Sequence, residues 1–510
     1  MTSLPSFREM TTVNAAMDCE GTGLDLFHTD MPFMCCMTFA TVPSWLKKRY
    51  PFITKNQLCY EWPVDPKNRQ TTYDLQDLYE IITLLSDPDI VWCFHNAKYD
   101  IRSIETAIKR FVGSTPCRKQ DRDKWKVISD WNPLDLCDVC HDTTPMSHAF
   151  DNLGSHELKA LSVRFQNIPE DDQYDLKQEV EALRLIVEPL GWKIAGPNTC
   201  PRVRQQPDGG WWVMDMWLPE AYAKYNPEYK SERRCATYCL RDTYRTVCLY
   251  QFYVQELKKE GLWEQYMENR EQLRITYRME DHGVPVNQPM ILSEQQRFKE
   301  VAGRHLFSAR RCVSRMMFNP NSSEQIATQL YFEFGVKPPR RSAKGGLTID
   351  QKELKNYYKH YAQELLISGQ KLENMVDLDE EDDEEQVIDY DEFPVVDQRK
   401  LLNLVTFLND VMAYKKCMTA ANTYLEGYRR ALHQRPDGWF LHPNFNITGT
   451  KTTRFSSSNP NGQNISKGKD SGDLSEEIKK LDLSLRKVLD RKSTRLNSSH
   501  VSESRMPSSA

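Results

Sequence analysis

The chain has 510 residues, of which 39% are hydrophobic and 11% aromatic. It can therefore bury several cores, and its length predicts roughly three domains. No stretch approaches the roughly 18 apolar residues of a membrane helix, and the N-terminus lacks the apolar segment of a secretory signal, so we expect a cytoplasmic protein without membrane partners. The 14 cysteines lack regular spacing, which indicates reduced thiols rather than a disulfide framework.

One acidic run sets the net charge of −5. Residues 377–392 hold 11 acidic residues and no Lys or Arg, so leaving them out changes −5 to +6. A mildly basic remainder is compatible with a nucleic-acid partner, although enzymes with neutral partners have the same balance. We expect 376–394 to be a disordered surface insert, with a DNA-mimicking gate over a basic cleft as the alternative.

Residues 13 to about 110 alternate apolar runs of strand length with segments of helical period. The runs VNAAMD, FMCCMTFATV, NQLCYEW and IVWCFHN predict four strands, and LQDLYEIITLLSD and YDIRSIETAIKRF predict two helices. This alternation predicts an α/β layer fold, with a sheet under helices.

Helical patterns dominate after about residue 133. A Trp- and Pro-rich stretch at about 190–232 is typical of inserted loops, and 255–435 is again mainly helical with charged amphipathic segments. The last residues, 491–510, are polar and without period. They are typical of translated linker sequence, so we expect a non-native tail there.

Two carboxylates close the first predicted strand. Asp18 and Glu20 are two residues apart, so they would point to the same face of a strand. Like charges this close repel unless a cation lies between them, and hard carboxylate oxygens suit Mg²⁺ or Mn²⁺. The alternative is a solvated strand end, because a lone D-x-E is common in a chain with 72 acidic residues.

Two later motifs supply further ligands. Asn96 and Asp100 stand where a strand passes into a helix, and Tyr238 and Asp242 are four residues apart and so share a helical face. With D-x-E first, N-x-x-x-D second and Y-x-x-x-D third, the chain resembles the proofreading 3′–5′ exonucleases with four acidic ligands and a tyrosine. HELKALSVRF at 156–165 resembles the helix between the second and third motifs of that family.

This resemblance implies an α/β exonuclease domain over 1–254, with a ribonuclease H-like fold in which helices cover a mixed sheet. It implies two divalent metal ions, Mg²⁺ or Mn²⁺, about 3.5–4 Å apart, which activate a water and relieve charge on the leaving 3′ oxygen. Asp18 would bridge both metals and Asp100 would hold one through water. Tyr238 would orient the attacking water, and Asn96 would position the substrate strand. The carboxylates that would hold the metals are Asp18, Glu20, Asp100 and Asp242.

A zinc site is a rival reading of the cysteines. Cys137, Cys140 and His141, with Cys117 upstream, imitate half of such a site. The second half is missing, and the CDVC cysteines fall on a segment predicted to be helical, where Cys packs as a small apolar residue.

Residues 440–466, FLHPNFNITGTKTTRFSSSNPNGQNIS, carry a second resemblance. They resemble the entry to the palm of family A DNA polymerases, whose pattern is T-x-T-G-R-x-S-S-x-x-P-N-x-Q-N-I-P. Thr453 stands for the Gly of the family and Ser466 for its final Pro. The matching residues are Thr450, Thr452, Arg454, Ser456, Ser457, Pro460, Asn461, Gln463, Asn464 and Ile465.

The second resemblance implies contact with primer–template duplex. Hydroxyls and amides reach sugars, phosphates and minor-groove acceptors, and Arg454 would neutralise a phosphate or enter the minor groove. It also implies a mainly helical thumb region at 255–438, which holds the acidic insert, and the start of a palm at 439–490. The expected polar contacts come from Thr450, Thr452, Ser456, Gln463 and Asn464.

The polymerase motifs of the family are a metal-binding Asp in a D-Y-S-Q-like strand, a fingers helix with Lys and Tyr, and an H-D-E turn. None follows Ile465. We therefore expect the exonuclease and primer–template-binding part of a phage-like family A DNA polymerase, without nucleotidyl transfer, in the cytoplasm of a phage-infected bacterial cell. A free-standing 3′–5′ exonuclease acting on RNA or DNA and a non-enzymatic DNA-binding fragment stay open, as does an unidentified processivity factor. The expected partners are a single-stranded DNA 3′ end and primer–template duplex.

Overall fold

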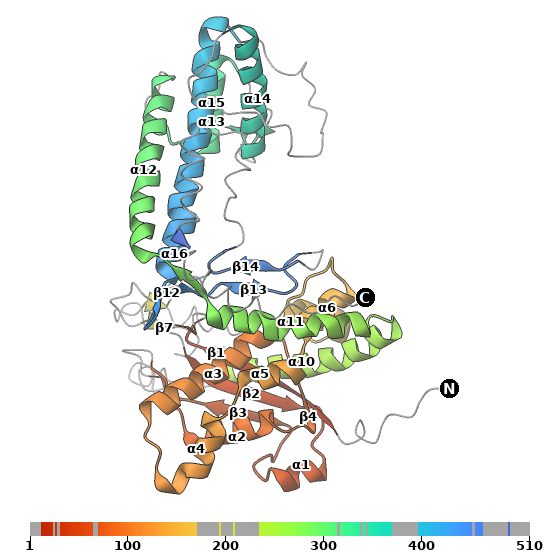
Figure 1. Ribbon diagram of the computed structural model, residues 1–510. Coiled ribbons are helices and arrows are strands. Elements are labelled where there is room, and N and C mark those ends of the chain that lie inside the picture. The colour runs from red at the N-terminus through yellow and green to blue at the C-terminus, as the bar shows by residue number, and fades with distance from the viewer. Residues whose placement is uncertain are drawn as a thin grey trace, which may run out of the picture. The chain divides into compact units, whose positions relative to one another are not determined.

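The computed structural model describes residues 12–23, 26–27, 31–64, 70–170, 193–194, 208–209, 234–313, 317–336, 340–342, 345–369, 396–450, 454–462 and 488–489. They divide into two compact units (Figure 1). The first unit is Met1–His282 with Phe445–Ser456, and the second is Gly283–Asn444 with Ser457–Ala510. Several predictions lie outside the described residues: most of the insertion at 190–232, the acidic insert 376–394, the tail 491–510, and Thr452, Gln463 and Asn464.

A five-stranded mixed sheet forms the centre of the first unit, in the order β3-β2-β1-β4-β5. Strand β1 pairs antiparallel with β2 and parallel with β4, so the sheet changes direction next to β1. The predicted sheet under helices is confirmed, and all four predicted strands are present. The strands are β1 (Val13–Gly21), β2 (Pro32–Phe39), β3 (Gln57–Glu61), β4 (Ile90–Phe94) and β5 (His141–Asp142).

Helices surround this sheet, and both helices predicted within the first 110 residues are present. The helices of the first unit are α1 (Ser44–Arg49), α2 (Leu75–Leu85), α3 (Ala97–Ser114), the 3₁₀ turn Lys119–Asp121, α4 (Arg122–Ser129), α5 (Pro133–Val139), α6 (Thr143–Phe150), α7 (Leu158–Gln166), α10 (Arg234–Lys259) and α11 (Trp263–His282). Two short strands, β6 (Lys193–Ile194) and β7 (Asp208–Gly209), pair with each other.

Alternate residues of β1 enter two different cores, because successive side chains of a strand point to opposite faces. Ala16 packs with residues of α6, α7 and α10. Asp18 and Glu20 share its parity, so they point toward the same side of the sheet as α10. The odd-numbered residues, which join the core beneath α2 and α3, are Val13, Ala15, Met17 and Cys19.

The second unit is mainly helical, as the sequence predicted for this part of the chain. Its core runs along the inner faces of its long helices. The helices are α12 (Gln288–Arg311), α13 (Ser323–Phe334), α14 (Gln351–Ile367), α15 (Gln398–Thr419), the π-helical turn Ala420–Leu425 and α16 (Glu426–Ala431). The strands are β8 (Val284–Val286), β9 (Arg340–Arg341), β10 (Leu347–Thr348), β11 (His433–Arg435) and β12 (Gly438–Leu441), while β13 (Asn444–Asn446) and β14 (Ser456–Ser458) lie at the ends of the Phe445–Ser456 segment.

The compact units do not follow the predicted ranges. The boundary predicted at residue 254 falls inside α10, and Leu273 and Tyr277 of α11 belong to the core of the first unit. The segment Phe445–Ser456, predicted to open a palm, also groups with the first unit. The thumb and palm assignments stay predictions.

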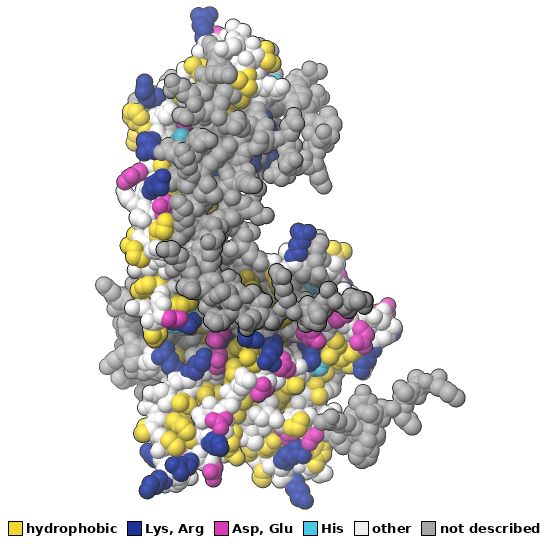
Figure 2. All heavy atoms as spheres, in the orientation of Figure 1, with side chains coloured by type: hydrophobic (Ala, Val, Ile, Leu, Met, Phe, Trp, Pro, Cys, Tyr) yellow, Lys and Arg dark blue, Asp and Glu magenta, His cyan; other side chains and the backbone are white. Residues whose placement is uncertain are grey.

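Charged side chains of both signs are interspersed on the face of the first unit that Figure 2 displays. This face carries no single basic field, so surface charge does not mark a nucleic-acid path on it. In the part of the chain that the structure describes, no helix is both long enough and apolar enough to cross a membrane.

Candidate active site

The D-x-E pair lies at the carboxyl end of β1. Asp18 and Glu20 pair across the ladder with Cys36 and Met34 of β2, and the register shifts directly after Glu20. This bulge ends regular pairing at Gly21, where a side-chain Cβ would lie 2.5 Å from the hydroxyl oxygen of Tyr99. The two carboxylates are therefore fixed at the last regular positions of the strand.

Asp100 reaches the same end of the sheet from α3. Asn96, in the left-handed conformation with φ 72°, precedes this helix, and the Asp142 carboxylate accepts hydrogen bonds from the N–H groups of Asn96 and Ala97 at 3.0 and 2.8 Å. Asp100, in the first turn of α3, accepts a hydrogen bond at its Oδ1 from the N–H of Cys19 at 2.9 Å. Cys19 is the residue between Asp18 and Glu20 in β1. The predicted strand-to-helix position of Asn96 and Asp100 is confirmed.

Helix α10 brings the third motif. Polar contacts fasten it to the sheet: the hydroxyls of Thr243 and Thr38 lie 2.6 Å apart, and Gln57 Nε2 donates to the carbonyl of Leu240 at 3.3 Å. Tyr238 and Asp242 are on this helix, as predicted. Asp242 is buried, whereas Tyr238 is half-buried.

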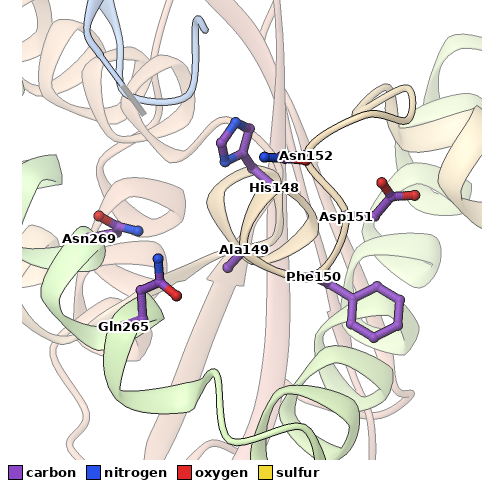
Figure 3. A pocket seen from close by; sticks show the side chains of 7 residues that line it. All are labelled: His148, Ala149, Phe150, Asp151, Asn152, Gln265 and Asn269. Carbon is purple, nitrogen blue, oxygen red and sulfur yellow. The ribbon is translucent and has the colours of Figure 1, made fainter. Parts of the chain in front are cut away.

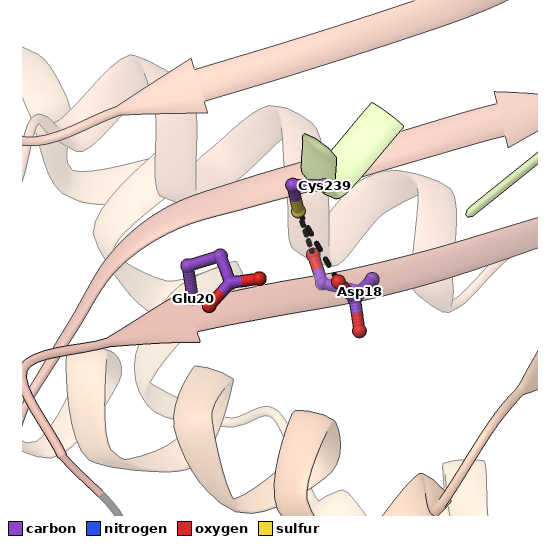
Figure 4. Close-up of side chains that lie close together, drawn as sticks. All are labelled: Asp18, Glu20 and Cys239. Atoms are coloured by element: carbon purple, nitrogen blue, oxygen red, sulfur yellow. Dashed lines mark hydrogen bonds between the residues drawn. The ribbon is translucent and has the colours of Figure 1, made fainter. Parts of the chain in front are cut away.

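Cys239 joins the carboxylates, and the sequence interpretation missed it. Its sulfur lies 3.3 Å from Oδ2 of Asp18, and one ligand atom each of Asp18, Glu20 and Cys239 lie within 4.8 Å of one another (Figure 4). Burial raises the pKa of the Cys239 thiol well above its usual range. The thiol donates a hydrogen bond to Asp18, and the hard carboxylate oxygens are the ligands that suit Mg²⁺ or Mn²⁺.

Two cations hold Asp242, and neither was predicted. Lys159 Nζ lies 2.6 Å from its Oδ1, and Arg245 Nη1 lies 3.0 Å from the same oxygen. Arg245 is only 1% exposed and also donates to the carbonyl of Pro169 at 2.6 Å. The Lys159 ammonium lies 3.8 Å from the centroid of the Tyr238 ring.

Negative charge accumulates in this cluster. Burial raises the pKa of Asp18 to about 7, and the charge of Asp242 adds to the shift. Burial and then the charge of Asp18 raise the pKa values of Glu20 and Asp100 well above their usual range. The carboxylates thus resist ionising together unless positive charge joins them.

The residues present fit a divalent metal. The ligand atoms of Asp18 and Glu20 are close enough to converge on one ion, and hard carboxylate oxygens suit Mg²⁺ and Mn²⁺. A cation, the Lys159 ammonium, already lies against the carboxylate of Asp242. The cluster therefore has the donor chemistry and the excess charge of a cation site.

The described part of the predicted DNA-contact segment docks onto the first unit. Phe445 is held at both backbone groups: its N–H donates to Glu280 Oε1 at 2.7 Å, and its carbonyl accepts from Lys98 Nζ. Further along, His148 Nε2 lies 3.1 Å from the carbonyl of Thr450. These contacts attach the segment to α3, α6 and α11.

The candidate DNA-contact residues that the structure describes are accessible. Arg454 is exposed, and its backbone N–H donates a hydrogen bond to Thr450 Oγ1 at 2.9 Å. Ser456 is half-buried and lies 3.4 Å from the side-chain amide of Asn446. Asn96 is exposed at the start of α3.

A cavity of about 340 Å³ opens beside α6 (Figure 3). None of the clustered carboxylates lines it, so the metal chemistry would take place elsewhere in the unit. Its lining residues are His148, Ala149, Phe150, Asp151, Asn152, Gln265 and Asn269.

The zinc alternative gains no support. Cys137 and Cys140 are buried around α5, and His141 Nδ1 lies 2.9 Å from the hydroxyl of Tyr266. Among the residues that the structure describes, the only group of three suited to a metal is Asp18, Glu20 and Cys239.

Comparisons with known proteins find likenesses among solved structures alone. No family model matches the sequence, and no curated protein matches it. Among solved structures, the POL domain of Pol1 from M. smegmatis in complex with DNA primer-template and dNTP is similar, with a TM-score of 0.49 and 14% identity. The match covers 91% of this chain and 53% of that chain, so this chain spans about half of its length. The functional argument therefore rests on the carboxylate cluster and on the sequence motifs.

Proposed function

We propose that the first unit is a metal-dependent 3′–5′ exonuclease acting on the 3′ end of single-stranded DNA, and that the chain is the proofreading and primer–template-binding part of a family A DNA polymerase. The observation that carries the proposal is the meeting of three motifs at one end of the sheet. Asp18 and Glu20 come from β1, Asp100 from α3 and Asp242 from α10, and their charges act on one another. A mixed sheet under helices also suits a ribonuclease H-like domain.

In this proposal Asp18, Glu20, Asp100 and Asp242 would hold the Mg²⁺ or Mn²⁺. When bound, the metal supplies an activated water and relieves charge on the leaving 3′ oxygen. Tyr238, on the same helix as Asp242, orients the water that attacks the phosphodiester. Asn96 is exposed where β4 passes into α3, and it positions the end of the substrate strand.

The Phe445–Ser456 segment supports the duplex-binding part of the proposal. Arg454 is exposed and its backbone N–H donates a hydrogen bond to Thr450 Oγ1, so the segment offers a charged group at its surface. Such a group contacts phosphates or the minor groove without reading sequence. The polymerase resemblance of this stretch is a second, independent pointer to DNA.

The test is degradation of 5′-labelled single-stranded DNA by the full chain with and without Mg²⁺. Replacing the doublet, Asp18→Asn with Glu20→Gln, should reduce the rate at least about 10²-fold, the scale for removing one preorganised electrostatic group. The matched control is Asp77→Asn: this half-buried carboxylate on α2 accepts from Trp62 Nε1 at 3.1 Å and lies outside the cluster.

The control should degrade DNA at the wild-type rate. An unchanged rate in the doublet variant would overturn the proposal, because the activity would then come from another site. Labelled RNA of the same sequence serves as the second substrate, and faster degradation of RNA would favour the free-standing RNA exonuclease.

A further inference from the structure

One buried cation of the site has no role in the mechanism above. Lys159, on α7, is 8% exposed, and its ammonium lies 2.6 Å from Asp242 Oδ1 and 3.8 Å from the centroid of the Tyr238 ring. Burial dominates the raised pKa values of Asp18 and Glu20, but the Lys159 charge lowers both. The ammonium therefore acts on Asp18 and Glu20 as well as on Asp242.

Asp242 does not need Lys159 for its own neutralisation. Arg245 donates to the same oxygen at 3.0 Å and is itself buried, so Asp242 keeps a charged partner without the lysine. Burying a second cation beside one carboxylate is costly unless further negative charge compensates it. Asp18, Glu20 and Asp100 supply that further negative charge when they are ionised.

The charges can be counted. In their ionised forms the four carboxylates Asp18, Glu20, Asp100 and Asp242 carry −4, and Lys159 and Arg245 carry +2, which leaves −2. One divalent ion balances −2, and two would leave the buried cluster at +2. The ligand atoms agree with this count, since Asp18 and Glu20 belong to the group that can share one ion, and Asp242 does not.

We propose that Lys159 takes the place of the second metal: the cluster binds a single divalent ion at Asp18 and Glu20, and the Lys159 ammonium supplies positive charge at Asp242. This inference rests on the proposed exonuclease function for its reaction, but it is a statement about metal stoichiometry. It departs from the two ions that the family resemblance implies. It also gives α7 a role, as the helix that delivers the cation.

The test is Mn²⁺ binding to the metal-stripped full chain, followed by electron paramagnetic resonance and calorimetry. Acidic residues elsewhere in the chain also bind Mn²⁺. The number of Mn²⁺ ions in the cluster is therefore the number of sites in the wild-type chain that are lost in the double variant Asp18→Asn with Glu20→Gln. We expect the wild-type chain to have one such site. Lys159→Met removes the charge and keeps the stem, and it should create a second site or tighten the first by at least about tenfold. Lys159→Gln is the second variant, and Lys126→Met, at an exposed position on α4, is the control.

Each outcome decides a different statement. Two sites in the wild-type chain would overturn the role of Lys159 and leave the exonuclease proposal standing. Unchanged stoichiometry and affinity in both Lys159 variants would overturn it as well. If the doublet variant loses no site at all, the exonuclease proposal itself fails, and the inference fails with it.

Discussion

Two buried lysine–carboxylate pairs of the first unit differ in what surrounds them. Lys159–Asp242 and Lys98–Glu280 are alike in burial, since both lysines are 8% exposed and both acids 7%. Their ion pairs measure 2.6 and 2.5 Å. Distance and burial alone would assign them the same role.

The Lys98–Glu280 pair binds the backbone of a chain segment. Lys98 and Glu280 pair with each other, and both also bond to the backbone of Phe445, at its carbonyl and its N–H respectively. The hydrogen bonds to Phe445 hold a chain segment. This pair is a structural clamp for the start of the Phe445–Ser456 segment.

The Lys159–Asp242 pair lies among further charged groups. Asp18, Glu20 and Asp100 add three more carboxylates, while Arg245 adds one more cation. Unmatched buried charge is unfavourable, and it persists where something outside the chain completes it. The difference teaches that an excess of charge, rather than the presence of an ion pair, distinguishes a site from a clamp.

The largest expected effect comes from removing the excess charge. Asp18→Asn with Glu20→Gln should raise thermal stability in the presence of EDTA, because it relieves like-charge repulsion. Mg²⁺ should raise the melting temperature of the wild-type chain, since a ligand that binds only the folded state stabilises it, and should leave that of the variant unchanged. Differential scanning calorimetry with Asp77→Asn as control measures both. Equal stabilisation of wild type and doublet variant by Mg²⁺ would place the metal elsewhere.

The next largest effect is a difference in the free energy of unfolding between variants of Lys98 and Lys159. Lys98→Met leaves Glu280 buried without its cation and should cost about 3 kcal/mol, the scale for breaking a buried pair. Lys159→Met should cost about 1 kcal/mol or less, because Arg245 still pairs with Asp242 and the hydrogen-bond term alone is that small. Urea unfolding compares the two variants, and hydrogen exchange at Phe445 reports locally on the clamp. Equal losses in both would remove the distinction between clamp and site.

The motifs of the carboxylate cluster could be predicted because the residues of each motif lie close together in the sequence. A strand fixes Asp18 and Glu20 two residues apart on one face, and a helix fixes Tyr238 and Asp242 on another. The strand and helix patterns also sufficed for the sheet under helices. What the spacing could not give is which faces meet, since that depends on the order of strands in the sheet.

The partners of these motifs were missed for the same reason. Lys159 and Arg245 carry no signal of their own, although Arg245 is three residues from Asp242 and helical spacing would have singled it out. Cys239 follows Tyr238 directly, and only its contact with β1 gives it a role. The Lys98–Phe445 contact spans most of the chain, and no local pattern reports it.

A third kind of buried group extends the comparison: an ionisable side chain that burial and nearby cations keep neutral. Burial, aided by the charges of Arg270 and Lys258, lowers the pKa of His141 from 6.5 to about 3. The unfolded chain therefore takes up a proton that the folded chain refuses, so stability contributed by neutral His141 is present above pH 6.5 and is lost as the pH falls toward 3.

His141→Gln should flatten the loss of stability between pH 6.5 and 3, by up to about 1.4 kcal/mol per pH unit. Urea unfolding at several pH values measures the slope, and the exposed His282, replaced by Gln, is the control. An unchanged slope in His141→Gln would mean that the histidine is charged in the folded chain.

The smallest effect tests what the clamp is for. Arg454→Ala should weaken binding of primer–template duplex by a few-fold and reduce the salt slope of the affinity by about one, because a single phosphate contact is lost. Lys98→Met keeps the charge of Arg454 but removes the partner of the Phe445 carbonyl, so it should weaken binding less and leave the salt slope nearly unchanged. Fluorescence anisotropy at a series of salt concentrations measures both, with Arg118→Ala as an exposed control. If Lys98→Met lowers the salt slope as much as Arg454→Ala does, the contact of Lys98 with Phe445 is needed to present Arg454 to DNA. If neither variant changes binding, the Phe445–Ser456 segment does not contact duplex.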